Sequence, residues 1–244
     1  MGEHIPEWCM TSVYNTYNDF YNRPIEIAHR GYSSKYADNS KEAFNEAIIH
    51  KFDMIELDIQ LCKNEIIVSH DLTIENKNMI DMTIEELKKY NIITLREFFN
   101  IVNRKSILVY LDLKGSIELS QKLLDYLYEL DVDFTKIYIA SFNIEHLDTI
   151  YKMNKINKMN KMNKTIKLGY ITDNVLDNKV INDLMKYDLK FICFDYNILT
   201  QECIDYCHNK NAHVFVYTCS YQKDYDVIKK LNKLDGIVTD YKIF

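Results

Sequence analysis

Residues 53–61 read DMIELDIQL, an apolar run in which two acidic side chains recur at alternate positions. The run is too short for a helix and is bounded by polar residues, so it predicts a β-strand. Side chains alternate between the two faces of a strand, which places Glu56, Asp58 and Gln60 together and the apolar side chains opposite them. Two carboxylates on one face repel each other unless positive charge lies between them. This pair alone leaves two interpretations open: a solvated face of an edge strand, or a functional cluster.

Strand-like and helix-like segments alternate along the chain from Ile25 onward. Eight strands with helices between them, in a chain of 244 residues, predict an α/β fold of the (β/α)8 TIM-barrel class. The apolar stripe behind Ser40 is typical of a helix with that serine as its N-cap. We expect strands at 25–29, 54–60, 107–113, 136–141, 166–171, 191–196, 213–218 and 236–240, and helices at 40–51, 116–130, 143–153, 176–187, 200–210 and 221–233.

One interval departs from this alternation. NEIIVSHD (64–71) predicts a short strand that forms a hairpin with the strand before it, and two helical segments follow at 83–90 and 94–103. We therefore expect an insertion over 63–105 at the C-terminal end of the second strand, which is the active-site face of such barrels. Residues 1–24 are expected to form an N-terminal extension, ahead of a barrel domain spanning 25–244.

The composition narrows the classes of function. With 47% hydrophobic and 13% aromatic residues the chain has enough apolar side chains for a sizeable core, while a net charge of −6 argues against a nucleic-acid partner. No stretch approaches the roughly 18 consecutive apolar residues of a membrane span, and the N-terminus lacks the features of a signal peptide. We expect a cytoplasmic protein without an integral membrane segment. Its six cysteines show no C-x-x-C pair and are expected to be reduced.

The stretch KMNKINKMNKMNK (152–164) is a low-complexity segment with a period of three. Lysines at that spacing drift around a helix and form no stripe, which favours a solvated extension over a nucleic-acid patch. Because the segment joins a helix to the fifth strand, we expect it at the end of the barrel remote from the chemistry.

Titratable side chains gather where neighbouring strands end. Closing the barrel would bring three carboxylates, two histidines, an arginine and a lysine to one mouth. Each has a structural explanation when taken singly, such as a hydrogen-bonded core histidine, so the prediction depends on all of them lying on the same side. These residues are His29 and Arg30 after the first strand, Glu56 and Asp58 in the second, His70 after the hairpin, and Asp112 and Lys114 at the end of the third.

The segments AHRGYSSKYADNSKEAF, FDMIELDIQLCKNEIIVSHD, LDLKG, ASF and DGIVTDY, in this order, resemble the glycerophosphodiester phosphodiesterase family. The resemblance covers almost the whole chain after Ile25, and H-R-G, E-x-D and H-D together are far more specific than any one of them. It implies a phosphoric diester hydrolase that releases glycerol 3-phosphate and an alcohol from glycerophosphodiesters. It also implies His29 and His70 as general acid and base, Glu56, Asp58 and Asp112 as ligands of one divalent cation, and Arg30 and Lys114 as phosphate-binding residues.

The implied chemistry agrees with the residue types. Oxygen-only ligands suit a hard ion, Mg²⁺ or Ca²⁺. Arg30 offers a planar fork to phosphate oxygens and Lys114 a point charge. Two imidazoles can take a proton from a nucleophile and give one to a leaving alkoxide near pH 7.

The chain also departs from the pattern of the family. Ala37-Asp38-Asn39-Ser40 stands where P-E-N-T is frequent, Asp112 replaces a commoner Glu, Tyr217 stands where Trp is frequent, and the hairpin turn at 63–65 lacks the usual Gly. An acid-x-Lys motif in which the acid is aspartate, as at Asp112 and Lys114, also resembles the related sphingomyelinase D-type phospholipases. Two alternatives stay open: a phospholipase D-like enzyme acting on lysophospholipids or sphingolipids, and a barrel that binds a phosphorylated ligand without catalysis. The sequence leaves the oligomeric state undecided.

Overall fold

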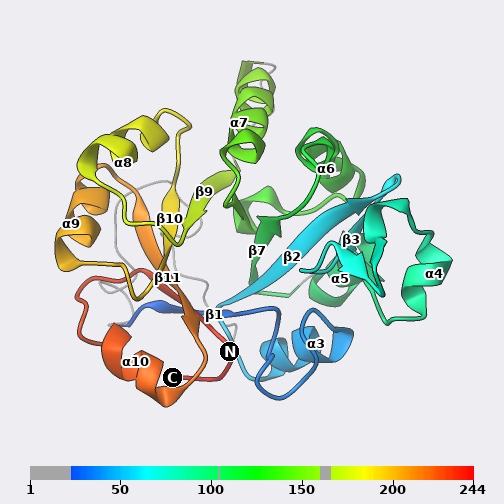
Figure 1. The fold of residues 1–244 in the computed structure, drawn as a ribbon, viewed down its shortest axis with the longest axis horizontal. Coiled ribbons are helices and arrows are strands. Elements are labelled where there is room, and N and C mark those ends of the chain that lie inside the picture. The colour runs from blue at the N-terminus through cyan, green and yellow to red at the C-terminus, as the bar shows by residue number, and fades with distance from the viewer. Residues whose placement is uncertain (1–22, 104, 160–165) are drawn as a thin grey trace.

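A closed ring of parallel strands forms the centre of the molecule (Figure 1). The structure is a computed structural model that describes residues 23–103, 105–159 and 166–244. In this part of the chain eight strands pair side by side, and β1 closes the ring by pairing with both β12 and β2, which confirms the predicted (β/α)8 barrel. In order around the ring the strands are β1 (Ile25–Ala28), β2 (Met54–Cys62), β7 (Leu108–Leu113), β8 (Ile137–Ser141), β9 (Lys167–Thr172), β10 (Phe191–Asp195), β11 (His213–Cys219) and β12 (Gly236–Thr239).

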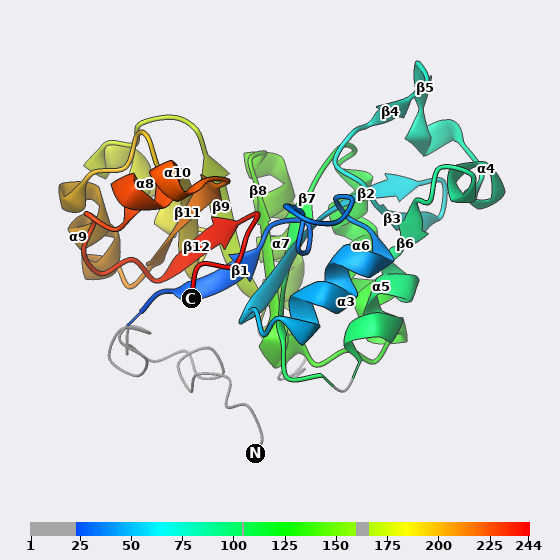
Figure 2. The same ribbon diagram turned by 90° about the horizontal axis from the view of Figure 1, so that it is seen from below.

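Helices cover the outside of the ring (Figures 1 and 2). Ser40 caps the first of them, as predicted, by accepting a hydrogen bond from the backbone N–H of Ala43. The helices that follow barrel strands directly are α3 (Lys41–Ile49), α6 (Glu118–Glu129), α7 (Ile144–Met159), α8 (Asn178–Met185), α9 (Gln201–Asn209) and α10 (Gln222–Ile228), and a short 3-10 turn, η2 (Phe134–Lys136), precedes β8.

The helix α7 departs most from the predicted bounds, since it continues to Met159 instead of ending at residue 153. Lysine and methionine are good helix formers, and the repeat contains no proline or glycine to stop the helix. Lys152 and Lys155 are exposed, in keeping with a solvated segment. Because α7 starts at the C-terminal end of β8 and precedes β9, its last turns lie toward the end of the barrel where the strands begin. Residues 160–164 of the repeat lie outside the described part.

The strand β2 is buried along its whole length, with one apolar cluster on its outer face and another at the start of its inner face. The side chains of Ile55, Leu57 and Ile59 pack outward against the helices. The opposite face points into the ring, where its first residue, Met54, joins a second cluster rich in aromatic rings. Phe191 lies at the centre of that cluster, and a Cβ at Gly169 would come within 2.3 Å of its ring, so that position requires glycine. Aromatic rings therefore fill the barrel near the N-terminal ends of its strands, and the polar side chains lie toward the C-terminal ends.

An excursion between β2 and β7 extends from one side of the barrel (Figure 2). β3 pairs with β2 as the predicted antiparallel hairpin, and Lys63 in its turn adopts a φ of 53°, the conformation for which glycine is usual. Thr83 and Thr94 each begin a helix with a capping box, in agreement with the two predicted helical segments. The small β4–β5 hairpin was not predicted. The elements are β3 (Glu65–Val68), β4 (Thr73–Ile74), β5 (Lys77–Asn78), η1 (Met79–Asp81), α4 (Ile84–Lys88), β6 (Ile93–Thr94) and α5 (Leu95–Val102).

Four further sequence predictions concern the N-terminal extension, the domain boundaries, membrane-spanning segments and the cysteines. Residues 1–22 of the expected N-terminal extension lie outside the described residues, and the domain boundaries stay a prediction. Within the described residues no helix has the length and apolar character needed to cross a membrane. The described cysteines are free thiols, and Cys9 is not among them.

Candidate active site

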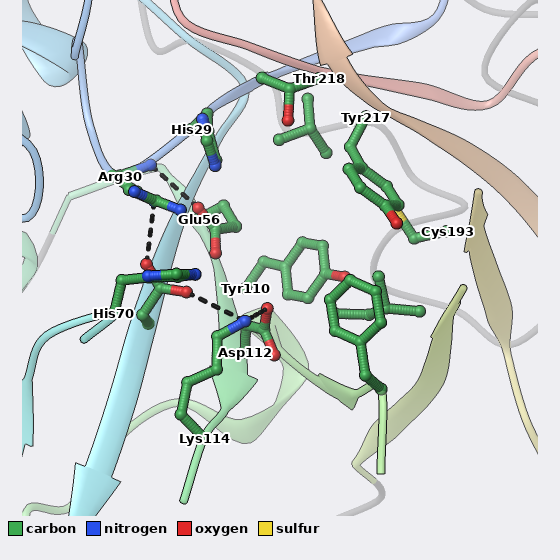
Figure 3. Close-up of a pocket in the computed structure, with 14 residues that line it drawn as sticks. His29, Arg30, Glu56, His70, Tyr110, Asp112, Lys114, Cys193, Tyr217 and Thr218 are labelled. Carbon is green, nitrogen blue, oxygen red and sulfur yellow. Dashed lines mark hydrogen bonds and ion pairs between the residues drawn. The ribbon is translucent and has the colours of Figure 1, made fainter. Parts of the chain in front are cut away.

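A cavity of about 170 Å³ opens at the C-terminal end of the barrel (Figure 3). All seven residues singled out from the sequence line it, so the closed ring brings together what the strand ends predicted. Its other walls are mostly apolar or aromatic. The lining residues are His29, Arg30, Glu56, Asp58, His70, Tyr110, Asp112, Lys114, Phe142, Ile171, Cys193, Tyr217, Thr218 and Val238.

Three carboxylates from two neighbouring strands meet on one side of the cavity. Asp58 and Asp112 are paired positions of β2 and β7, and Glu56 lies one step earlier on the same face of β2. One oxygen from each of the three lies within 4.8 Å of the others, and their exposed fractions are only 2–5%. The interpretation of the acidic pair as a solvated edge face is therefore wrong, because β2 pairs on both sides and its polar face points into the barrel.

The electrostatics of this trio call for a positive charge. Burial, the larger cause, and repulsion by Asp58, the second, together raise the pKa of Glu56 to about 8. Burial also raises the pKa of Asp112 to about 7, although Lys114 partly opposes it. One oxygen of Asp112, Oδ1, is buried and has no hydrogen-bond partner among the described residues. Because a hard cation would pair that oxygen and offset the mutual repulsion, the donor set fits Mg²⁺ or Ca²⁺.

Arg30 ties the end of β1 to this cluster. Its backbone N–H donates to Glu56 over 2.9 Å, and its side chain reaches Asp58 at 3.1 Å and Asp38 at 3.0 Å. Arg30 and Gly31 both have positive φ, of 54° and 83°, so the chain turns sharply at this point.

Two further contacts explain the local sequence. A Cβ at Gly31 would come within 2.7 Å of the backbone of Ala43, which leaves room only for glycine. Asn39 donates its side-chain amide to Asp58 over 3.0 Å, while the backbone N–H of Asp58 donates back to the Asn39 side chain. Asn39 therefore ties the stretch at 37–40 to the E-x-D strand, which the sequence pattern alone did not reveal.

Lys114 occupies the space between two of the carboxylates. Its ammonium lies 2.7 Å from Asp112 and 3.4 Å from Asp58, and 5.1 Å from the ring centre of Phe142. Burial opposes the charge, but the carboxylates outweigh it and raise the pKa of Lys114, so the side chain stays protonated. The positively charged ammonium of Lys114 thus lies at the edge of the acidic cluster and faces the cavity (Figure 3).

The first of the two histidines, His29, is held by a carboxylate on the side of its ring that faces away from the cavity. Its Nδ1 lies 2.6 Å from Asp240, a residue that follows β12. Burial disfavours the charged ring, yet the bond to Asp240 and the proximity of Glu56 outweigh it and raise the pKa of His29. Asp240 was missed as a site residue, although an acid at the end of a barrel strand is the signal that identified the other carboxylates.

The second histidine, His70, lies on the loop after β3 and is more open to solvent. Its side chain is 46% exposed, and Nδ1 lies 2.9 Å from the exposed carboxylate of Asp71. Gln60, the third polar residue on the inner face of β2, donates to the backbone oxygens of Ser69 and Asp71 over 3.1 and 2.6 Å. Gln60 therefore holds the backbone of the loop that carries His70, a role that the sequence pattern did not suggest.

An aromatic wall faces the charged side of the cavity. The rings of Phe142 and Tyr217 meet edge to face at 5.9 Å. The hydroxyl of Tyr217 is buried and has no hydrogen-bond partner among the described residues. The cavity thus joins an anion-attracting side to an apolar side, which suits an ester of phosphate with an organic group.

Comparisons with known proteins agree with this site. Residues 29–242 match the model of the glycerophosphoryl diester phosphodiesterase family. A glycerophosphodiester phosphodiesterase from Caldanaerobacter subterraneus subsp. tengcongensis is 28% identical over 241 residues, which cover 89% of this chain and 94% of the relative. The crystal structure of a glycerophosphodiester phosphodiesterase from Thermotoga maritima has a TM-score of 0.73 at 25% identity and covers 89% of this chain and 95% of its own.

A further solved structure shares the fold. It is a phosphodiesterase from Oleispira antarctica in complex with the product sn-glycerol-3-phosphate, with a TM-score of 0.73 at 18% identity. The match covers 91% of this chain and 95% of that one.

Proposed function

The chain belongs to the glycerophosphoryl diester phosphodiesterase family and is a phosphoric diester hydrolase, and on this premise we propose that it converts glycerophosphodiesters to glycerol 3-phosphate and an alcohol. The observation that carries the proposal is the cavity itself, which joins a buried carboxylate trio, two cationic side chains and two histidines. Each of these groups answers one requirement of phosphodiester hydrolysis.

Binding of the phosphate is assigned to Arg30 and Lys114. A phosphodiester is an anion, and both side chains line the cavity with positive charge. Asp58 contacts both of them, at 3.1 and 3.4 Å, so their positions are fixed before the substrate arrives. A substrate phosphate at this place would have its charge neutralised without a rearrangement of either side chain.

Glu56, Asp58 and Asp112 are proposed to hold one divalent cation, Mg²⁺ or Ca²⁺. The repulsion within the trio and the unpaired oxygen of Asp112 support this assignment. When bound, such an ion would neutralise charge on the phosphoryl group and polarise one of its oxygens.

His29 and His70 are proposed to move the protons. One imidazole takes a proton from the oxygen that attacks phosphorus, and the other gives a proton to the alkoxide released when the phosphorus–oxygen bond breaks. The two rings reach the cavity from different elements, the end of β1 and the loop after β3 (Figure 3). Since both histidines are present and face the cavity, a barrel that only binds a phosphorylated ligand is disfavoured.

A phospholipase D-like activity on lysophospholipids or sphingolipids remains the second candidate. It is favoured by two apolar side chains near the mouth, Phe142 with 41% and Leu72 with 48% exposure. Phe142 lines the cavity, and Leu72 approaches Gly115, the residue after Lys114. An acyl chain leaving the cavity could cover these side chains.

One assay separates the candidates. Release of the alcohol is measured for glycerophosphocholine, glycerophosphoethanolamine, lysophosphatidylcholine and sphingomyelin, each with Mg²⁺, with Ca²⁺ and with a chelator. We expect the water-soluble diesters to be hydrolysed in the presence of a divalent cation only. Faster turnover of the lipids would favour the second candidate, and a Leu72→Ser variant would then lose activity on lipids alone. No turnover of any substrate would contradict both.

A further inference from the structure

The contact between His29 and Asp240 joins two ends of the barrel sequence that lie 211 residues apart. Asp240 does not line the cavity, whereas His29 does. The ring of His29 points into the cavity above Glu56 (Figure 3), and its Nδ1 faces away from it, toward the carboxylate. Asp240 therefore makes no direct contact with a substrate in the cavity, and its hydrogen-bonded link to the cavity is the ring of His29.

The carboxylate of Asp240 is itself held on both oxygens. Oδ1, which contacts His29, also accepts a hydrogen bond from the hydroxyl of Ser33 over 3.0 Å. Oδ2 accepts one from the hydroxyl of Ser220 over 2.5 Å. The backbone is fixed as well, because the N–H of Asp240 donates to Cys219 and that of Ser34 donates to the Asp240 carbonyl. Residues of two neighbouring segments, 29–34 and 219–220, thus hold the carboxylate against the ring of His29.

This arrangement selects one form of the neutral imidazole. The three hydrogen bonds hold the pKa of Asp240 below its ordinary value, although burial opposes them, so the group is an anion at neutral pH. A carboxylate anion only accepts hydrogen bonds, so Nδ1 of His29 must carry the proton. The other nitrogen, Nε2, is then left with its lone pair on the side of the cavity.

From this geometry we propose that Asp240 is a positioning residue for the reaction, one that fixes the orientation of His29 and keeps its Nε2 available for proton transfer. The inference rests on the proposed function of His29 and extends it to a residue that never touches the substrate. His70 has no equivalent, because its partner Asp71 is 80% exposed and held less firmly. Of the two histidines, His29 is therefore the one whose orientation is set before the substrate binds.

The protein contains a matched control at the opposite end of the barrel. Asp235 is fully buried and contacts two histidines, His208 at 2.7 Å and His213 at 3.0 Å, but none of these residues lines the cavity. Asp235→Asn therefore removes a carboxylate from a histidine contact at a place that does not touch the cavity. Asp240→Asn makes the same chemical change beside His29.

The experiment compares both variants in the full chain with glycerophosphocholine and a saturating divalent cation. For Asp240→Asn we expect kcat to fall by roughly 10²- to 10⁴-fold while KM changes by less than about threefold, since an asparagine can donate to Nδ1 and stabilise the wrong tautomer. Asp240→Glu, which keeps the carboxylate, should recover part of kcat. Asp235→Asn should lower the unfolding free energy but leave kcat near that of the wild type.

A second readout needs no turnover. In ¹⁵N NMR spectra of histidine-labelled protein, at a pH above the titration of His29, the wild type should show the Nδ1–H tautomer, and Asp240→Asn should lose it. The proposal is overturned if the wild type shows the Nε2–H tautomer, or if Asp240→Asn keeps kcat within about threefold. If the wild type hydrolyses no glycerophosphodiester, the proposed function fails, whereas the spectra still decide whether Asp240 orients His29.

Discussion

Replacing Asp112 by asparagine should stabilise the metal-free protein and, at the same time, weaken its response to a divalent cation. The two effects have opposite signs because the carboxylate is unfavourable in the empty cluster and favourable in the presence of a cation. A residue that served only as the ion-pair partner of Lys114 would show neither effect. The variant therefore distinguishes a metal ligand from a structural anion.

The magnitude follows from the raised pKa of Asp112. Burial and the charge of Asp58 hold it at about 7 in the fold, with Lys114 acting in the opposite direction, against 3.8 for an ordinary aspartate. An acid whose pKa is raised in the fold destabilises the protein as pH rises above the ordinary value, and the full effect is present above pH 7. A difference of about three pKa units corresponds to about 4 kcal/mol, which is the upper limit of what an uncharged asparagine would restore.

The assay is urea unfolding at pH 8, with a chelator and with millimolar Mg²⁺ or Ca²⁺. With the chelator we expect Asp112→Asn to be more stable than the wild type by about 2–4 kcal/mol. At a cation concentration 100 times the dissociation constant the wild type should gain about 2.7 kcal/mol, and the variant much less. Asp112→Glu keeps the charge and is the control, with a cation response close to that of the wild type. A variant that is less stable than the wild type with the chelator, yet equally stabilised by the cation, would refute the reasoning.

Three further outcomes are expected. His29→Ala and His70→Ala should each lower kcat by roughly 10²- to 10⁴-fold, measured with glycerophosphocholine, and near wild-type turnover would make that histidine structural. Gly31→Ala should lower the unfolding free energy by about 2 kcal/mol or more, since its Cβ would meet Ala43 at a φ of 83°, and an unchanged melting temperature would contradict this. Burial opposes ionisation of Asp235, but the hydrogen bonds from His208 and His213 outweigh it and lower the pKa of the carboxyl to about 2. The carboxylate should therefore contribute about 2 kcal/mol to stability above pH 4 that is lost as pH falls toward 2, so the unfolding free energies of wild type and Asp235→Asn should converge over that range.

The parts of the fold that depend on local periodicity could be predicted from the sequence. The alternation in residues 53–61 gave β2, and the apolar stripe behind Ser40 gave α3. The seven strand-end residues met at one cavity because the closure of a parallel barrel brings all carboxyl ends of its strands to one side. That topological rule is why a list of strand ends was enough to locate the cavity.

Contacts between individual side chains could not be predicted from such patterns. The pairing of His29 with Asp240 and the hydrogen bonds from Gln60 to the loop that carries His70 depend on side-chain distances between neighbouring strands. The β4–β5 hairpin was missed for a different reason. Its turn uses Glu75 and Asn76, both with positive φ, and only the asparagine is a usual residue for that conformation.

The pairing of β1 with β12 has a consequence for the protein while it is being made. During translation β1 leaves the ribosome early and β12 late. Until residues 236–239 emerge, the growing chain can form only an incomplete ring, in which β1 and β11 each have an unpaired edge. Through all of that time His29 has been synthesised but the carboxylate that orients it has not. Translation that halts before β12 thus yields a polypeptide with nearly every residue of the cavity and no closed barrel to hold them, and enzyme activity begins only with the last strand.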